Sequence, residues 1–311
     1  MELSLIIPVN NEEENLPGFY NELKQVLKPL ENLKKTYEII FIDDGSLDNS
    51  FKILSNLAEK DKNIKIIKLK TNYGQSIALR AGLDICKGEK IITLDADGQH
   101  DPKFIPYYFK KLDKYDVVCN IRLKRTKLTT NFGNWLIKKF FKSKLKDSIG
   151  GMKGLTKQVK ENIYIYGDMH RYLPLLAQWK GFKVGEQPII VRKRKKGKSK
   201  YNPLKSIKGF IDLMTVKFFV SYSSRPSHIF GGMGIFSTGI GILLLLLLTI
   251  RKLFYLIPIG QNLPLFMLGI LLTLIGFNFI FFGFVGDMIS YNHLSQCNQK
   301  NYIVDEVVKK I

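Results

Sequence analysis

The chain has 311 residues, of which 45% are hydrophobic, and a formal net charge of +21. That length is enough for one large domain or two smaller ones. The three cysteines, Cys86, Cys119 and Cys297, lie far apart and lack metal-ligand spacing, which argues against a cysteine zinc site and favours reduced cytosolic thiols.

Strands and helices alternate over the first 120 residues. Apolar runs predict buried strands at Leu3–Val9, Tyr37–Ile42, Ile64–Leu69, Lys90–Leu94 and Asp116–Asn120. Helical spacing predicts helices at Leu16–Leu33, Ser50–Lys60 and Gln75–Lys87, and one that begins at Asp101–Pro102. This alternation predicts a mostly parallel sheet with right-handed crossovers.

The pattern is looser beyond residue 120. Helices are expected at Phe132–Phe141 and Asp168–Trp179, and a short strand at Ile189–Val191. From Leu204 to Phe218, apolar residues recur at helical spacing with charged residues elsewhere on the wheel. This predicts an amphipathic helix on a membrane surface, although a core helix shows the same spacing.

Two stretches near the C-terminus carry no charge, Ile229–Ile250 and Leu253–Gly286. Each is long enough for the ~20 residues of a transmembrane helix. A buried core helix is the alternative, but Leu243–Leu248 is a run of leucines with no polar face. We therefore expect two membrane spans.

Basic residues concentrate at Arg122–Lys146 and Arg192–Lys208. Nucleic acid attracts such surfaces, but an anionic membrane face fits better here because the second stretch lies just before the first span. That placement puts this end of the chain in the cytoplasm. Since a short loop joins the spans, both termini are expected to be cytoplasmic.

Polar clusters follow the predicted strands that end at Val9, Ile42 and Leu94. In parallel sheets, ligands bind beyond the carboxyl ends of the strands, so the three clusters should share one edge. Asp43, in the second cluster, is suited to accept hydrogen bonds from a nucleobase or ribose.

Asp95 and Asp97 stand one residue apart at the end of the fourth predicted strand. Mg²⁺ and Mn²⁺ prefer oxygen ligands and often share them with substrate phosphates, and Gln99 offers a further carbonyl oxygen. A turn stabilised by Asp side chains is the alternative. His100 is suited to touch metal or phosphate, or to satisfy the turn. His170 would serve helix packing or pocket shape.

These segments resemble family 2 glycosyltransferases of the polyprenyl-phosphate type, which include dolichyl-phosphate mannose synthases and bactoprenol glucosyltransferases. The matching segments are residues 7–13, 42–48, 72–74, 95–102, 169–172, 194–201 and 225–228. The first four are shared widely in the superfamily. Gly197–Tyr201 and the two C-terminal spans narrow the resemblance to the polyprenyl-phosphate group.

The resemblance implies an α/β fold of the GT-A type, Rossmann-like, with a nucleotide-sugar donor. The donor would be bound by Pro8, Asn10, Glu12, Asp43, Asp95, Ala96, Asp97, Arg194 and Lys200. The family usually has an aromatic residue in place of Asn10, which puts base stacking there in doubt. Asp168 stands where a Glu is common.

The resemblance also implies Mg²⁺ or Mn²⁺ as cofactor. Its ligands would be Asp95, Asp97 and Gln99. Catalysis would depend on Asp97, Asp147 and Arg122, and the acceptor phosphate would be bound by Arg122 and Lys153. Asp147 would position Arg122 or Lys153, or take a residual proton.

The reaction implied is transfer of one sugar from a UDP- or GDP-sugar to polyprenyl phosphate at the cytoplasmic face, with inversion. The expected organisation is a GT-A domain at residues 1–200, followed by an amphipathic segment at 201–227. Two spans follow at 228–250 and 263–286, and then a cytoplasmic tail at 287–311. The hairpin would leave apolar surface for lipid or for a second copy of the chain.

Two other functions fit parts of the sequence. Processive polysaccharide synthases resemble the chain up to the acidic motif, but usually carry Gln-x-x-Arg-Trp and more spans, and Gln178–Trp179 is not that motif. A glycosyltransferase with another acceptor is closely related. A non-catalytic basic membrane protein that binds lipid or nucleic acid would have no organised acidic pocket.

Overall fold

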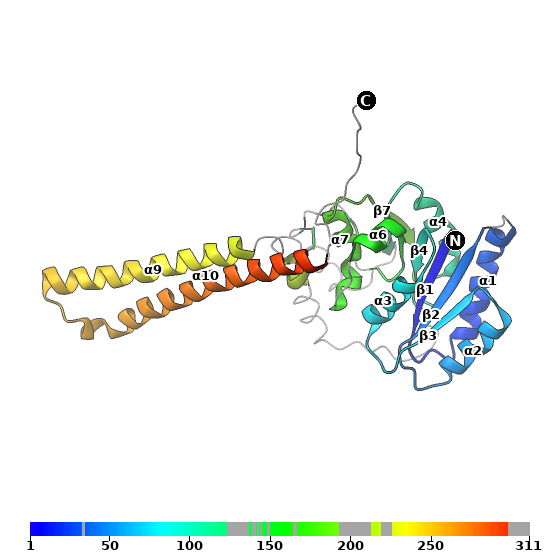
Figure 1. Ribbon diagram of the computed structural model, residues 1–311, viewed down its shortest axis with the longest axis horizontal. Helices are drawn as coiled ribbons and strands as arrows, with labels where there is room; N and C mark the ends of the chain where they lie inside the picture. The colour runs from blue at the N-terminus through cyan, green and yellow to red at the C-terminus, as the bar shows by residue number, and fades with distance from the viewer. Residues whose placement is uncertain are drawn as a thin grey trace, which may run out of the picture. The chain divides into compact units, whose positions relative to one another are not determined.

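The structure is a computed structural model. It describes residues 1–32, 35–122, 137–138, 141, 143, 145–147, 150–163, 167–192, 213–218 and 226–297. The chain divides into two units, Met1–Val216 and Lys217–Ile311. A sheet with helices makes up the first unit, and a hairpin of two long helices the second (Figure 1).

A mixed sheet organises the described part of the first unit. Its strands are β1 (Leu3–Val9), β2 (Tyr37–Asp43), β3 (Ile64–Lys68), β4 (Lys90–Thr93), β5 (Val117–Arg122), β6 (Lys153–Thr156) and β7 (Val184–Ile189). Their order is β3-β2-β1-β4-β6-β5-β7. Neighbours pair in parallel except for β6, which is antiparallel to β4 and β5. The prediction of a mostly parallel sheet is confirmed.

Helices and short 3-10 turns connect the strands. They are α1 (Leu16–Asn32), α2 (Ser50–Lys60), α3 (Gln75–Ile85), η1 (Pro102–Phe104), α4 (Ile105–Lys111), α6 (Lys157–Asn162), η2 (Gly167–Tyr172) and α7 (Leu173–Trp179). The helix expected at 168–179 is divided between η2 and α7, and a proline occupies the first turn of α7.

The sheet is covered on both faces, which explains why its central strands are almost uniformly apolar. Leu5 and Ile7 of β1 pack into the same core as Leu23 of α1. Ile6, which points to the opposite face by the alternation of a strand, meets α3. A Cβ on Gly82 of α3 would lie 2.6 Å from Ile6 Cγ2, so this helix sits close against the strand.

Two features differ from the sequence-based expectations. β6 was not expected, because its four residues, Lys-Gly-Leu-Thr, lack an apolar β-branched run. The strand expected at Ile189–Val191 begins earlier, at Val184. Of the helices expected at 132–141 and 204–218, only 137–138, 141 and 213–218 lie within the described residues, and these are helical.

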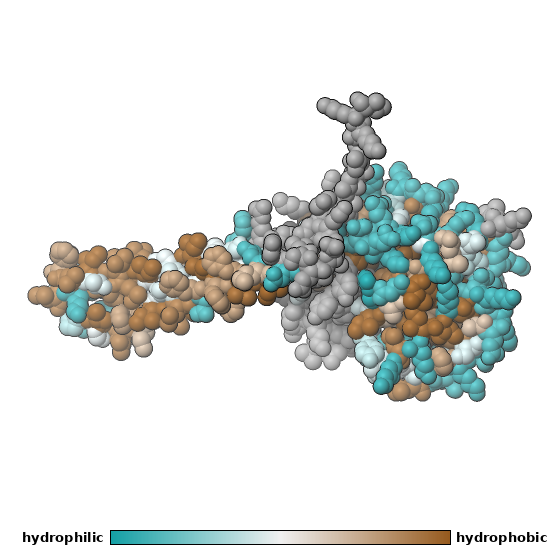
Figure 2. All heavy atoms as spheres, in the orientation of Figure 1, coloured by the Kyte–Doolittle hydropathy of each residue, from teal (hydrophilic) through white to brown (hydrophobic). Residues whose placement is uncertain are grey.

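The second unit consists of α9 (Pro226–Tyr255), η3 (Ile259–Asn262) and α10 (Leu263–Cys297). Pro226–Tyr255 and Ile259–Ser290 are long and apolar enough to cross a membrane. Only 17% and 11% of their most hydropathic windows are buried, unlike a core helix. Figure 2 shows hydrophobic residues over the hairpin surface. These helices are compatible with association with a membrane.

Glycines spaced seven residues apart bring the two helices into backbone contact. Gly234 and Gly241 of α9 face Gly276 and Gly269 of α10. A Cβ on Gly276 would lie 2.7 Å from the Gly234 carbonyl oxygen, and one on Gly241 would lie 2.7 Å from that of Gly269. Small residues permit this close approach in apolar surroundings, and the spacing keeps them on one helix face.

We expect Gly276→Ala to loosen this hairpin, since the new methyl group would collide with backbone that cannot move aside. Overpacking of this kind costs about 1–3 kcal/mol. Hydrogen exchange of the full chain in detergent should show faster exchange in peptides from α9 and α10. Gly239→Ala is the matched control, because its Cβ would meet nothing within 4 Å. Equal effects of the two substitutions would contradict the contact.

Candidate active site

The polar clusters after β1, β2 and β4 meet at one edge of the sheet, because these strands run in parallel. Two hydrogen bonds join the first two clusters. The Asp44 amide donates to the Val9 carbonyl oxygen at 2.8 Å, and Asn10 Nδ2 donates to the Asp44 carbonyl oxygen at 2.7 Å. Pro8 lies just before this junction, opposite Ile42.

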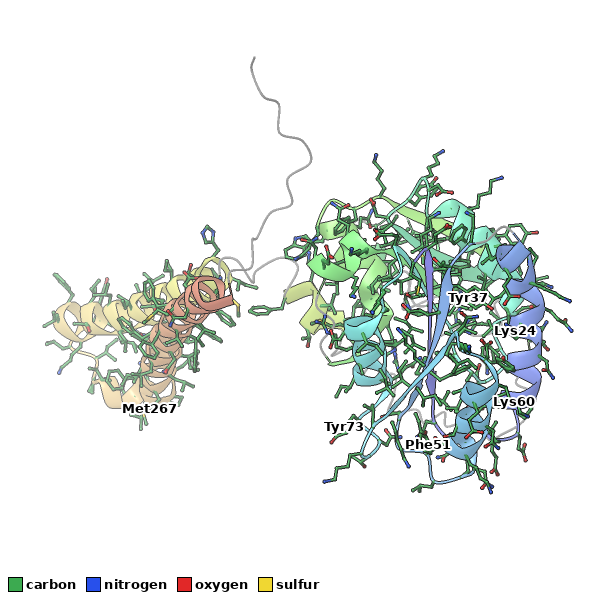
Figure 3. All side chains as sticks on the ribbon, turned by 45° about the vertical axis from the view of Figure 1, so that its right-hand side comes forward. Lys24, Tyr37, Phe51, Lys60, Tyr73 and Met267 are labelled. Carbon is green, nitrogen blue, oxygen red and sulfur yellow. The ribbon has the colours of Figure 1, made fainter. Side chains whose placement is uncertain are left out.

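The Asp44 carboxylate fixes a fourth loop, the one after β3, at the same edge. Its Oδ1 and Oδ2 accept hydrogen bonds from the amides of Tyr73 and Gly74 at 2.8 and 3.0 Å. Figure 3 shows Tyr73 at this end of the sheet. Gly45 has a φ of +64°, and a Cβ there would lie 2.5 Å from the Thr71 carbonyl carbon. This position therefore requires glycine.

Asp43 is fully buried beside these loops. Its Oδ1 accepts a hydrogen bond from the Ser46 amide at 3.1 Å, whereas Oδ2 has no partner among the described residues. Glu12, on the loop after β1, accepts a hydrogen bond from Asn15 Nδ2 at 2.6 Å. A buried carboxylate oxygen is rarely left unpaired, so Asp43 is well placed to accept a hydrogen bond from a ligand.

The acidic motif after β4 gathers three groups that suit a metal ion. One ligand atom each from Asp95, Asp97 and His100 lie within 4.8 Å of one another. Asp95 Oδ1 accepts a hydrogen bond from Gln75 Nε2 at 2.6 Å, and Asp97 Oδ1 accepts one from the Gln99 amide at 3.0 Å. Carboxylate oxygens with an imidazole fit Mn²⁺, and carboxylates fit Mg²⁺.

His100 strengthens this donor set. Its Nδ1 is buried without a hydrogen-bond partner among the described residues, 3.8 Å from Asp95 Oδ2. A metal ion would satisfy a buried imidazole nitrogen left in this state. Ala96, which separates the two aspartates in the sequence, is buried. The Gln99 carbonyl oxygen accepts a hydrogen bond from the Arg192 amide at 2.9 Å.

A cavity of about 300 Å³ lies next to Asp95. Its wall combines carboxylate, amide, imidazole and cationic groups with a few small residues. The lining residues are Gln75, Asp95, Gln99, His100, Arg122, Gly150, Gly151, Lys153, His170, Arg171 and Val191. The cavity therefore has a candidate metal-binding group on one side and positive charge close by.

Arg122, at the end of β5, forms a bidentate ion pair with Asp147. Its Nε lies 2.8 Å from Asp147 Oδ2, and its Nη2 lies 3.1 Å from Oδ1. Asp147 is completely buried, and its amide donates to Glu186 Oε1 at 3.3 Å. Since both carboxylate oxygens bind the guanidinium, the pair fixes how Arg122 is presented to the cavity.

Lys153 is a buried cation in the cavity wall. Its ammonium group donates to the Gly150 carbonyl oxygen at 2.6 Å. Burial lowers the pKa of Lys153 to about 8, although the negative charge of Asp95 opposes this shift. Gly151, two residues before Lys153, lies close to Asp95, since a Cβ there would lie 2.8 Å from Asp95 Oδ2.

Several residues of this site were not singled out from the sequence. Gln75 begins α3 with no motif of its own, and Gly151 matters only through its close approach to Asp95. Arg192, expected as part of a basic stretch, is bound within 2.6 Å by Glu22 and by Asp101. The two cations expected to bind the donor, Arg194 and Lys200, lie outside the described residues.

We expect Lys153→Met to change how stability depends on pH. Because folding lowers the Lys153 pKa, the unfolded chain binds the proton more tightly. The cost of burying the charge is complete below about pH 8 and fades as the pH rises toward 10.5. This cost of burying the Lys153 charge is about 3 kcal/mol.

Denaturant unfolding in detergent between pH 7 and 10 measures this effect. The stability of the wild type should rise with pH relative to Lys153→Met. Lys153→Arg, whose charge persists over this range, should show no such rise. A constant difference between wild type and Lys153→Met across the range would show that the ammonium is not destabilised by burial.

Comparison with solved structures identifies the fold. The crystal structure of glucosyl-3-phosphoglycerate synthase from Mycobacterium tuberculosis with Mn²⁺, UDP and glucosyl-3-phosphoglycerate is similar, with a TM-score of 0.53 at 15% sequence identity. The match covers 70% of this chain and 78% of that one. The expected GT-A fold is confirmed.

Curated relatives match along almost the entire chain. A dodecaprenyl-phosphate galacturonate synthase of Rhizobium johnstonii is 29% identical, over 99% of this chain and 93% of its own. An undecaprenyl-phosphate 4-deoxy-4-formamido-L-arabinose transferase of Proteus mirabilis is 29% identical, over 99% and 94%. Residues 4–166, just over half of the sequence, match the family described as Glycosyl transferase family 2. The chain belongs to glycosyl transferase family 2.

Proposed function

We propose that this protein transfers one sugar, with inversion, from a UDP- or GDP-sugar to a polyprenyl phosphate. One observation carries the proposal: a single cavity has the acidic motif at Asp95 on one side and the cations Arg122 and Lys153 in its wall. A donor diphosphate with its metal needs the carboxylates of the acidic motif, and an acceptor phosphate needs the cations. Both full-length relatives are named for polyprenyl-phosphate sugars, which supports this acceptor.

The donor would be held along the sheet edge. The unpaired Asp43 oxygen would accept a hydrogen bond from the nucleoside, beside Pro8, Asn10 and Glu12. Asp95 and Asp97, with Gln99 or His100, would hold Mg²⁺ or Mn²⁺, a fit supported by the three clustered ligand atoms. When bound, the metal supplies positive charge to the leaving diphosphate.

Arg194 and Lys200 would add to the charge that stabilises the leaving group. Both belong to the basic stretch that follows β7. Arg192, the first residue of this stretch, donates a hydrogen bond from its amide to the carbonyl oxygen of Gln99 in the acidic motif. Cationic side chains aimed at a developing diphosphate lower the barrier to transfer. We therefore assign this stretch to the donor side of the site.

The acceptor phosphate would bind Arg122 and Lys153. It is already anionic near neutral pH, so the reaction needs no strong general base. Asp147 is completely buried and spends both carboxylate oxygens on Arg122, so its proposed role is to position that guanidinium. Nucleophilic attack at the anomeric carbon in a single displacement inverts the configuration.

The long apolar helices support a membrane location for the acceptor. We infer two spans, at 228–250 and 263–286, preceded by a GT-A domain at 1–200 and an amphipathic segment at 201–227, with a tail at 287–311. The basic stretch at Arg192–Lys208 favours the cytoplasmic face for the catalytic domain and both termini. Contact between hairpins of two copies is compatible with this arrangement.

We expect sugar transfer into organic-extractable lipid to require Asp97. Purified protein in detergent would receive polyprenyl phosphate, Mn²⁺ or Mg²⁺ and a panel of labelled UDP- and GDP-sugars. Asp97→Asn should reduce transfer by roughly 100-fold or more, since it weakens the stabilisation of the leaving diphosphate. Asp84→Asn, at an exposed helical ion pair, is the control. If no sugar is transferred from any donor, the result would argue against polyprenyl phosphate and in favour of another acceptor.

We expect Arg122→Ala to act mainly on the acceptor. The KM for polyprenyl phosphate should rise roughly tenfold or more, because a charge-assisted hydrogen bond contributes about 1.5–3 kcal/mol. The KM for the nucleotide sugar should change little. Asp147→Asn should give a smaller effect in the same direction, with Lys183→Ala as an exposed control. Equal increases in both KM values would argue against an acceptor role.

A further inference from the structure

One part of the cavity wall has no role in the reaction as proposed so far. It is His170 of η2, which lines the cavity and is hydrogen-bonded to Ser76 of α3. His170 Nδ1 and Ser76 Oγ are hydrogen-bonded, and both side chains are buried. His170 also lines the cavity, together with Gln75 and Asp95. Because the bond joins two elements far apart in the sequence, it fixes the imidazole as part of the wall.

The ring of His170 is neutral. Its pKa is lowered to about 3, first by burial and then by the positive charges of Lys153 and Arg171. With Nδ1 occupied by Ser76, the remaining ring nitrogen is Nε2, for which the described residues supply no hydrogen-bond partner. His170 is therefore a fixed, uncharged hydrogen-bonding group in the cavity wall, in addition to the amide side chains of Gln75 and Gln99.

A sugar hydroxyl matches this nitrogen better than a phosphate does. A hydroxyl donates and accepts, so it pairs with Nε2 in either tautomer of the ring, whereas a phosphate oxygen accepts only. The phosphate groups have stronger partners in the same cavity, since Lys153, Arg171 and Arg122 all line it. The neutral imidazole of His170 therefore suits a neutral ligand group better than it suits a phosphate.

We propose that His170, held in place by Ser76, hydrogen-bonds a hydroxyl group of the transferred sugar and so contributes to the choice of donor. The inference rests on the proposed function, because it takes the cavity beside Asp95 to receive the sugar. His170 is then a specificity-determining residue. Ser76 is a positioning residue, which acts by fixing the orientation of the ring.

Binding without acceptor tests this role. Calorimetry with the full chain in detergent and Mn²⁺ would compare UDP-glucose, UDP-galacturonate and GDP-mannose with UDP and GDP. His170→Leu should weaken the best-bound nucleotide sugar roughly five- to fifty-fold but the matching nucleoside diphosphate by less than about twofold. His170→Gln, which keeps a neutral hydrogen-bonding group, should recover part of the loss.

Ser76→Ala should weaken nucleotide-sugar binding in the same selective way, to a smaller extent. Ser55→Ala is its matched control, because that hydroxyl bonds the Phe51 carbonyl oxygen within α2. Equal losses for sugar and bare diphosphate would reduce His170 to a structural residue. A wild type that binds no nucleotide sugar more tightly than the diphosphate would also overturn the proposal. Neither result depends on polyprenyl phosphate, so failure of the proposed acceptor is separate.

Discussion

The parallel pairing of β1 with both β2 and β4 is the constraint on which the site depends. It brings the carboxyl ends of three strands, and hence three polar loops, to one edge of the sheet. The Asp44 carboxylate then joins a fourth segment to that edge through the amides of Tyr73 and Gly74. Thus a buried apolar sheet, formed for stability, also gathers residues that lie far apart in the sequence, such as Asn10 and Asp97.

Much of this arrangement can be predicted from the sequence, because long apolar strands and strand-end aspartates leave clear local patterns. Asp95, Asp97 and Asp43 were recognised in this way. What could not be predicted depends on contacts between distant segments. β6 has no apolar run, and Gln75, Ser76 and Gly151 carry no motif. These residues come together only when the strands have paired into the sheet.

The charged residues that line the cavity come from different parts of the sheet. The candidate metal ligands lie on the loop after β4. Arg122 and Lys153 belong to β5 and β6, which form an antiparallel pair next to β4. The later strands therefore add cationic residues to the proposed donor site, which is formed by the earlier strands. The neutral His170 lines the same cavity, so in the proposed reaction phosphate groups and sugar hydroxyls would be recognised by different residues.

The ion pair between Arg122 and Asp147 has a consequence for how this sequence can change over time. Asp147 is completely buried, and both of its oxygens bind the guanidinium. Loss of Arg122 alone leaves the buried Asp147 carboxylate without its partner, which costs about 3–5 kcal/mol, whereas exchange of both residues together is far milder. Divergent sequences should therefore alter these two positions jointly, and a designer who grafts the site must move them as one unit.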